Sequence, residues 1–244
     1  MPNYLLIIEY DGSGFHGWQK QPRCRTVQGE IEKAAAKILG RPVKVTGAGR
    51  TDAGVHAKGQ AANIFANKDF KAQGLVPALN AHLPDSVSVV SARRVPDGFN
   101  ARRAAKEKIY SYRVWNRQFR SVWAQKTSWH IKRQLDMEKV KETAEKLIGR
   151  HDFGAYASAG GVSENKSVNL KKIKVRRKNG FTIFTFTADR FLYRMIRNIM
   201  GTLVEAGRGR LDPKKAGQAL KEGKRNFGIT AAPPQGLFLD KVKY

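Results

Sequence analysis

Residues 168–188 read VNLKKIKVRRKNGFTIFTFTA, and this stretch decides the fold class of the second half of the chain. β-branched and aromatic residues alternate with polar ones on both sides of Asn179-Gly180. An Asn-Gly pair between two alternating segments is the strongest short-range signal for a two-residue β-hairpin turn. The stretch therefore predicts two antiparallel strands, Val168–Arg177 and Phe181–Ala188, joined by a tight turn.

The segments on either side of this hairpin predict a lobe that mixes strands and helices. The other elements expected in this half are a strand at Lys108–Trp115, a helix that begins at Met137 after the cap residue Asp136, a helix over Arg190–Glu205, a helix that follows the cap residue Asp212, and a closing strand at Gly236–Val242.

The first half predicts the same kind of lobe. Its expected elements are a strand at Asn3–Tyr10, a helix over Val27–Leu39 between the cap residues Thr26 and Gly40, strands at Pro42–Thr46 and Gly59–Ala66, a helix from the cap residue Asp69 to His82, and a strand at Ser86–Val95. The order β-α-β-β-α-β is that of the ferredoxin-like plan.

We therefore predict an α/β (α+β) fold with two ferredoxin-like or RRM-like lobes. Residues 1–100 form the first lobe and residues 101–244 the second. The two lobes are expected to form a mostly antiparallel sheet with flanking helices and a cleft between the lobes. Lobes of this kind serve many unrelated functions, so the fold alone assigns none.

Charge is the strongest compositional signal. The 244 residues contain 46 Lys and Arg against 20 Asp and Glu, a net charge of +26. Residues 1–100 hold 13 basic and 8 acidic residues, and residues 101–133 alone hold ten basic residues against the single acid Glu107. An excess of this size predicts a polyanionic partner, most often a nucleic acid, whose binding weakens steeply with salt. A role in solubility or at an anionic membrane surface is the alternative.

Several classes of protein are not expected. No run of about 18 apolar residues is present, so we expect no membrane-spanning helix. The N-terminal segment lacks a basic leader and a cleavage site, which argues against a signal peptide. The single cysteine, Cys24, excludes an intramolecular disulfide and a Cys-rich zinc site. We therefore expect a cytoplasmic protein.

The segment Gly47–Ala57, GAGRTDAGVHA, surrounds one acid with glycines. It is not a dinucleotide loop, because Asp52 replaces the third glycine and strand-like residues follow where a helix should begin. The GK[ST] ending of a phosphate-binding loop and the alternating oxygen ligands of a calcium loop are also missing. Two interpretations remain: a tight turn in which Asp52 bonds local backbone, or a reachable carboxylate that Arg50 helps to keep ionised.

The motif GRTDAGVHA resembles the aspartate motif of tRNA pseudouridine synthases of the TruA family, and the resemblance extends along the whole chain. The other similar blocks are YDGSGFHGWQKQP (Tyr10–Pro22), LNAHLPDSV (Leu79–Val87), FNARRAAKEKIYSYRV (Phe99–Val114), GRHDFGAY (Gly149–Tyr156), FLYRMIRNIMGTLVEAGRG (Phe191–Gly209) and APPQGLFLDKVKY (Ala232–Tyr244). Six or seven blocks in the family's order are hard to obtain by chance.

The resemblance implies a role for each matching residue. Asp52 takes the position of the catalytic nucleophile, Tyr110 lies against the target base, Arg197 pairs with the aspartate, and Arg50 holds the base out of the stem. The implied reaction isomerises uridines 38, 39 and 40 of the tRNA anticodon stem-loop to pseudouridine through a covalent Asp adduct. It requires neither a metal nor a cofactor, and the family acts as a homodimer. Whether the carboxylate attacks C1′ or C6 stays open, as does the choice between Tyr110 and a water for removal of the C5 proton.

Each of these side chains also has a purely structural interpretation. Tyr110 and Tyr112 share a strand face and are consistent with packing residues. Arg190, Arg194 and Arg197 lie on roughly one face of the expected helix and are consistent with a solvated or phosphate-binding stripe. A structural hydrogen-bonding role is the favoured interpretation of His56. Packing is favoured for Phe15 and Trp18.

Two other functions remain open at this stage. A non-catalytic RNA-binding module fits the charge, but KIYSYRVW does not match the RNP1 pattern and such a protein gives no reason for GRTDAG. A pseudouridine synthase with a different RNA target fits both the charge and the motif.

Overall fold

The computed structural model describes residues 1–67, 69–161, 163–224 and 230–244, and the chain forms two compact units. Unit 1 comprises Met1–Lys106 together with Phe238–Tyr244, and unit 2 comprises Glu107–Leu237. Residues 101–106 and 238–244 were expected in the second lobe, but both segments belong to unit 1. For the second segment, the pairing of β10 (Leu237–Lys243) in parallel with β3 (His56–Phe65) accounts for this.

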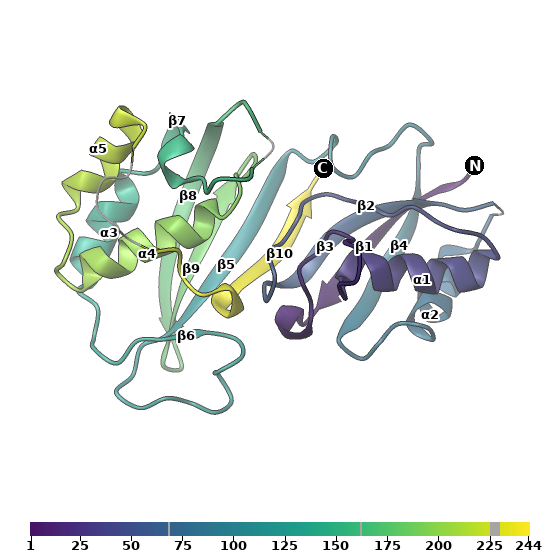
Figure 1. The fold of residues 1–244 in the computed structure, drawn as a ribbon, viewed down its shortest axis with the longest axis horizontal. Coiled ribbons are helices and arrows are strands. Elements are labelled where there is room, and N and C mark those ends of the chain that lie inside the picture. The colour runs from purple at the N-terminus through teal and green to yellow at the C-terminus, as the bar shows by residue number, and fades with distance from the viewer. Residues whose placement is uncertain (68, 162, 225–229) are drawn as a thin grey trace. The chain divides into compact units, whose positions relative to one another are not determined.

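Unit 1 is a sheet with two helices (Figure 1). Its strand order is β4-β1-β3-β10, with β1 antiparallel to both β3 and β4, and with the short β2 paired antiparallel to β3. The elements not yet given bounds are β1 (Asn3–Tyr10), the 3₁₀ turn η1 (Gly12–Gly14), α1 (Val27–Leu39), β2 (Thr46–Gly47), α2 (Ala72–Asn80) and β4 (Val87–Val95). The predicted β-α-β-β-α-β order is confirmed for this unit.

Local signals explain most of the boundaries in unit 1. The Thr26 hydroxyl accepts a hydrogen bond from the Gly29 amide at the start of α1, and Gly40 ends that helix in the left-handed conformation at φ 66°. The prediction that Asp69 caps α2 is wrong. Asp69 instead accepts a hydrogen bond from the Tyr4 hydroxyl and pairs with Arg94, so a tertiary contact takes the carboxylate away from the helix. The strand expected over residues 42–46 is reduced to β2.

Unit 2 contains the sheet β5-β9-β8-β7, in which neighbours are antiparallel, and β6 pairs in parallel with β5. Its helices are α3, drawn in teal in Figure 1, and α4 and α5, drawn in green to yellow-green. The bounds are β5 (Glu107–Trp115), β6 (Trp129–His130), α3 (Met137–Glu145), β7 (Gly149–Asp152), η2 (Gly154–Tyr156), β8 (Ser167–Lys178), β9 (Phe181–Ala188), α4 (Met195–Gly207), α5 (Lys214–Glu222) and η3 (Pro234–Gly236).

In unit 2 the hairpin turn and the start of α3 agree with the sequence prediction, whereas the start of α4 does not. Asn179 and Gly180 both have positive φ, 49° and 83°, as a tight hairpin turn requires. Asp136 accepts hydrogen bonds from the first amides of α3, as expected. The helix expected from Arg190 begins only at Met195, because Arg194 adopts the left-handed conformation at φ 56° and interrupts the helical path.

Both units have the predicted mixed α/β architecture with mostly antiparallel strands and flanking helices. Apolar and aromatic side chains fill the interior of each, led by Tyr4, Leu6 and Ile8 in unit 1 and by Tyr112, Phe184 and Phe186 in unit 2. Within the residues that the structure describes, no helix has the length and apolar character to cross a membrane.

Candidate functional site

The glycine-framed acid lies in a loop of unit 1 between β2 and β3, over residues 48–55, which we call the Asp52 loop. Burial alternates along it: Arg50 is exposed, Thr51 is 8% exposed, and Asp52 is half-buried. In an extended chain successive side chains point to opposite sides. Thr51 therefore faces the interior, while Arg50 is exposed and Asp52 remains partly accessible.

The segment Tyr10–Trp18 holds the backbone of this loop. The Trp18 amide donates to the Thr51 carbonyl at 3.0 Å, and the Gly54 amide donates to the Phe15 carbonyl at 3.4 Å. Gly17 has φ 90°, and a Cβ there would lie 2.6 Å from the Thr51 carbonyl oxygen. The close approach and the left-handed conformation both require glycine at position 17.

Two side chains bond the Asp52 loop from the interior. The hydroxyls of Tyr10 and Thr51 lie 2.8 Å apart in a buried hydrogen bond. The Gln60 amide donates to the Gly49 carbonyl at 2.8 Å. Burial raises the pKa of the Tyr10 hydroxyl, and hydrogen bonds from Thr51 and Gln60 only partly offset this. Tyr10 is therefore neutral at physiological pH, and either hydroxyl can donate in the bond between Tyr10 and Thr51.

His56, four residues after the acid, is a structural residue. Its side chain is buried, its Nδ1 lies 3.1 Å from an Asp11 carboxylate oxygen, and its ring stacks on Phe238 at 4.6 Å. The Gly12 amide also lies within hydrogen-bond distance of Nδ1, at 3.2 Å. These contacts confirm the structural interpretation. Phe15 and Trp18 are 4% and 3% exposed, which confirms that they pack in the interior.

Tyr110, the residue assigned to the target base, lies in unit 2 on β5. It is 6% exposed, faces Phe186 in the strand register, and makes an edge contact with Phe191 at 5.1 Å between ring centroids. Tyr112, two residues on, is fully buried and donates its hydroxyl to the Pro233 carbonyl at 2.7 Å. Tyr112 is therefore a core residue, and Tyr110 lies in an aromatic group at the edge of that core.

Arg197 lies in the first turn of α4 in unit 2. Its Nε donates to the Ala232 carbonyl at 2.7 Å, and its own carbonyl accepts from the Ala232 amide at 2.9 Å. Burial raises the pKa of Tyr112, and the positive charge of Arg197 lowers it, so the guanidinium lies near that ring. Arg190 and Arg194 precede the helix, so the expected stripe of arginines on one helical face is wrong.

The basic segment 101–133 is largely exposed. Eight of its ten cations are exposed, namely Arg102, Arg103, Lys106, Arg117, Arg120, Lys126, Lys132 and Arg133. Its single acid, Glu107, lies 2.9 Å from the Lys171 ammonium, so its charge is compensated. A surface hollow of about 240 Å³ in unit 2 is lined by Lys132 and Arg133 together with Arg208 and Arg210. One-signed, solvated charge of this kind suits a polyanion.

The described residues contain no group of three or more His, Cys, Asp or Glu arranged to hold a metal ion.

A family model described as tRNA pseudouridine synthase matches residues 6–102 and 143–244. The chain belongs to the tRNA pseudouridine synthase family. Proteins named tRNA pseudouridine synthase A are similar over its whole length. The one from Methylacidiphilum infernorum is 43% identical over 99% of this chain and 95% of its own. The one from Aquifex aeolicus is 41% identical over 99% of each chain, and the one from Thermoanaerobacter sp. is 39% identical over the whole of both.

The match to the family covers three of the four residues singled out from the sequence. Arg50 and Asp52 fall in the first matched range and in unit 1, whereas Arg197 falls in the second range and in unit 2. Tyr110 lies between the two ranges of the family model, although the full-length relatives cover its segment.

The sequence analysis missed the residues that hold the Asp52 loop from within. Tyr10 opens the block YDGSGFHGW, and Thr51 lies between the two charged residues of the aspartate motif. Their position inside these two blocks was the available signal. This signal indicates only that Tyr10 and Thr51 belong to the two motifs. The hydrogen bond between them joins residues 41 positions apart in the sequence, so only the fold reveals it.

Proposed function

We propose that this protein is an isomerase that converts uridine to pseudouridine in tRNA, with Asp52 as its covalent nucleophile. The full-length membership of the family supports the reaction. The local geometry supports the nucleophile: Asp52 is half-buried, stands in a loop whose backbone is bonded from several sides, and lies between Gly49 and Gly54, which carry no side chain.

The proposed chemistry suits a carboxylate. The bond from ribose C1′ to uracil N1 breaks, a bond from C1′ to C5 forms, the proton leaves C5, and N1 takes up a proton, so the product is an isomer of the substrate. A covalent adduct with Asp52 divides this rearrangement into easier steps. In this proposal Tyr110 contacts the base, Arg197 pairs with the nucleophile, and Arg50 occupies the position that the extruded base leaves.

The decisive test is tritium release from tRNA labelled at C5 of uridine, for the wild type and for Asp52→Asn. We expect release by the wild type and a loss of at least about 10³-fold in Asp52→Asn, with tRNA binding retained. Asp85→Asn makes the same change of charge at an exposed position of unit 1 and should behave as the wild type.

Two results would contradict the proposal. Near-normal turnover by Asp52→Asn would show that Asp52 is not the nucleophile. No release by the wild type, with tRNA still bound, favours a non-catalytic RNA-binding protein or a different RNA target.

We propose further that the target uridines are positions 38, 39 and 40 of the anticodon stem-loop, as the resemblance implies. Single transcripts that keep a uridine at only one of these positions test this directly. Each should release tritium, and a transcript with cytidine at all three should release none. Release from the triple replacement would place the target elsewhere in the tRNA.

We also propose that two copies of the chain associate. Three exposed apolar side chains on one loop of unit 2 support this: Phe119, Val122 and Trp123 are 76%, 70% and 92% exposed. Contiguous exposed apolar groups usually mark an interaction surface. Sedimentation should show a dimer for the wild type and a monomer for Phe119→Ser/Trp123→Ser. A monomeric wild type would contradict the proposal.

A further inference from the structure

The residue between Arg50 and Asp52 is anchored by a buried bond, although Arg50 is exposed and Asp52 is only half-buried. Thr51 is 8% exposed, and its hydroxyl lies 2.8 Å from that of Tyr10, at the end of β1. Tyr10 is itself 5% exposed. A threonine side chain has few rotamers, so a fixed hydroxyl also fixes the direction of its Cα–Cβ bond. The anchor therefore sets the orientation of the peptide that leads into Asp52.

The backbone on either side of this anchor is bonded as well. The Thr51 carbonyl accepts from the Trp18 amide, and the Gly49 carbonyl accepts from the Gln60 side chain. The bonds come from three different parts of unit 1, namely the end of β1, the Tyr10–Trp18 segment and β3. A loop held from several directions has little freedom to rotate, and the Thr51 hydroxyl makes its bond one residue before the nucleophile.

We infer that Tyr10 and Thr51 are positioning residues for the proposed reaction, and that their hydroxyl–hydroxyl bond sets the direction in which the Asp52 carboxylate meets the ribose or the base. This inference rests on the proposed role of Asp52 as nucleophile. Neither residue needs to touch the RNA, because Thr51 and Tyr10 are both buried in unit 1. Their loss therefore acts on the chemical step and leaves the capture of tRNA unchanged.

The test removes one hydroxyl at a time without a change of shape. Tyr10→Phe and Thr51→Val each delete one partner of the bond, and Thr51→Ser keeps it. Displacement of a reacting group by about 1 Å costs on the order of 10²-fold in rate. We therefore expect single-turnover rates at least about tenfold lower in Tyr10→Phe and in Thr51→Val, with the dissociation constant for tRNA within about twofold of the wild type.

Two further variants separate positioning from general stability. Thr51→Ser should recover most of the rate because it retains the hydroxyl. The double variant Tyr10→Phe/Thr51→Val should be no slower than Tyr10→Phe, because Tyr10→Phe already removes the bond to Thr51 together with the contact between the Tyr10 hydroxyl and Gln60.

Tyr4→Phe is the matched control on the same strand. Tyr4 is 1% exposed, and its hydroxyl bonds Asp69 and the backbone of Phe70, which lie in another loop. Its loss should lower the melting temperature as much as Tyr10→Phe does, yet leave the single-turnover rate unchanged.

Three outcomes would overturn the inference: wild-type rates in Tyr10→Phe and Thr51→Val, an equal rate loss in Tyr4→Phe, or a loss confined to tRNA affinity. Each of these outcomes is distinct from failure of the proposed function. If the proposed function is wrong, the wild type releases no tritium or Asp52→Asn stays active, and this result does not depend on Tyr10→Phe.

Discussion

Two irregular loops of this molecule differ in which side chains they bury and which they expose. The Asp52 loop of unit 1 turns Thr51 inward and receives bonds from three other parts of its unit. The loop over residues 116–128 of unit 2, between β5 and β6, is bonded at its start to the residues that follow β6, because the Asn116 side chain donates to the carbonyls of Ile131 and Arg133. The Trp115 indole donates to the Phe119 carbonyl at 2.9 Å, and the Ser128 hydroxyl donates to the Ala124 carbonyl at 2.7 Å.

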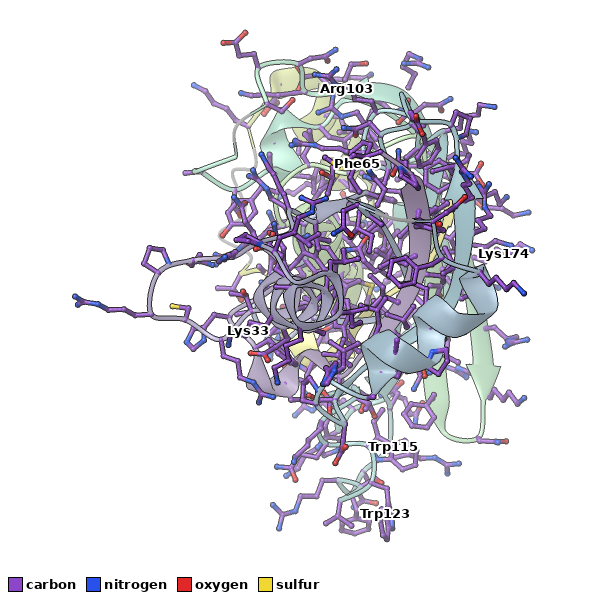
Figure 2. All side chains as sticks on the ribbon, turned by 90° about the vertical axis from the view of Figure 1, so that its right-hand side faces the viewer. Lys33, Phe65, Arg103, Trp115, Trp123 and Lys174 are labelled. Atoms are coloured by element: carbon purple, nitrogen blue, oxygen red, sulfur yellow. The ribbon has the colours of Figure 1, made fainter. Side chains whose placement is uncertain are left out.

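The difference appears at the surface of each loop. The 116–128 loop presents Phe119 and Trp123 almost fully to solvent, and in Figure 2 Trp123 lies at the outer end of the loop, beyond Trp115. The Asp52 loop exposes charged Arg50 but no large apolar side chain. A loop that carries a reacting group needs a fixed backbone, whereas a loop that meets another molecule needs exposed contact area. The two loops therefore differ in what they expose, because one presents charge and the other presents large apolar side chains.

The largest effect is expected when a single methyl group, added in Gly17→Ala, disturbs the segment that holds the Asp52 loop. In Gly17→Ala, the left-handed conformation costs about 1 to 2 kcal/mol, and the overlap with the Thr51 carbonyl adds about 1 to 3 kcal/mol. Thermal or urea unfolding should show this loss of stability, and tritium release should fall as well. Gly40→Ala is the control, because Gly40 has φ 66° but nothing within 4 Å of its Cβ position. Equal losses in both variants would show that the close approach is unimportant.

A loss of tRNA affinity of intermediate size, without a loss of catalytic rate, is expected when cations are removed from the 116–128 loop. Arg117→Gln/Arg120→Gln removes two exposed cations from the 116–128 loop. Affinity for tRNA should fall by about tenfold at low salt, and the slope of log K against log salt should decrease by about one for each phosphate that the variant no longer neutralises. The single-turnover rate at saturating enzyme should stay unchanged.

Lys33→Gln/Lys37→Gln on α1 makes the same change of charge on an exposed helix face and should weaken binding less. An equal loss of affinity in the two double variants would mean that only net charge matters.

The smallest expected effect is the change in the free energy of unfolding when Trp123 of the 116–128 loop is replaced. Trp123→Ser should change the free energy of unfolding of the isolated chain by no more than about 0.5 kcal/mol, because the side chain packs on little of its own unit. Phe15→Ser, in the segment that holds the Asp52 loop, should cost about 3 kcal/mol or more. Denaturant titration measures both. A large loss of stability in Trp123→Ser would show that this indole packs inside the chain in solution.

The sequence by itself determined the features that depend on neighbours along the chain. The turn at Asn179-Gly180, the cap of α1 by Thr26 and the cap of α3 by Asp136 are all set by a few adjacent residues, and all are confirmed. The aspartate motif also pointed to Arg50 and Asp52 because the unusual glycine framing is visible in a short stretch. The roles assigned to Asp52, Arg50, Tyr110 and Arg197 all stay predictions.

Only the tertiary structure decided what depends on distant residues. Asp69 was available to cap α2, but Tyr4 and Arg94 bind it instead. The last strand pairs with β3, which places residues 238–244 in unit 1. Thr51 meets Tyr10 only because β1 and the Asp52 loop are brought together in the fold. Local signals reach three or four residues, whereas these contacts join groups that only folding brings within hydrogen-bond distance.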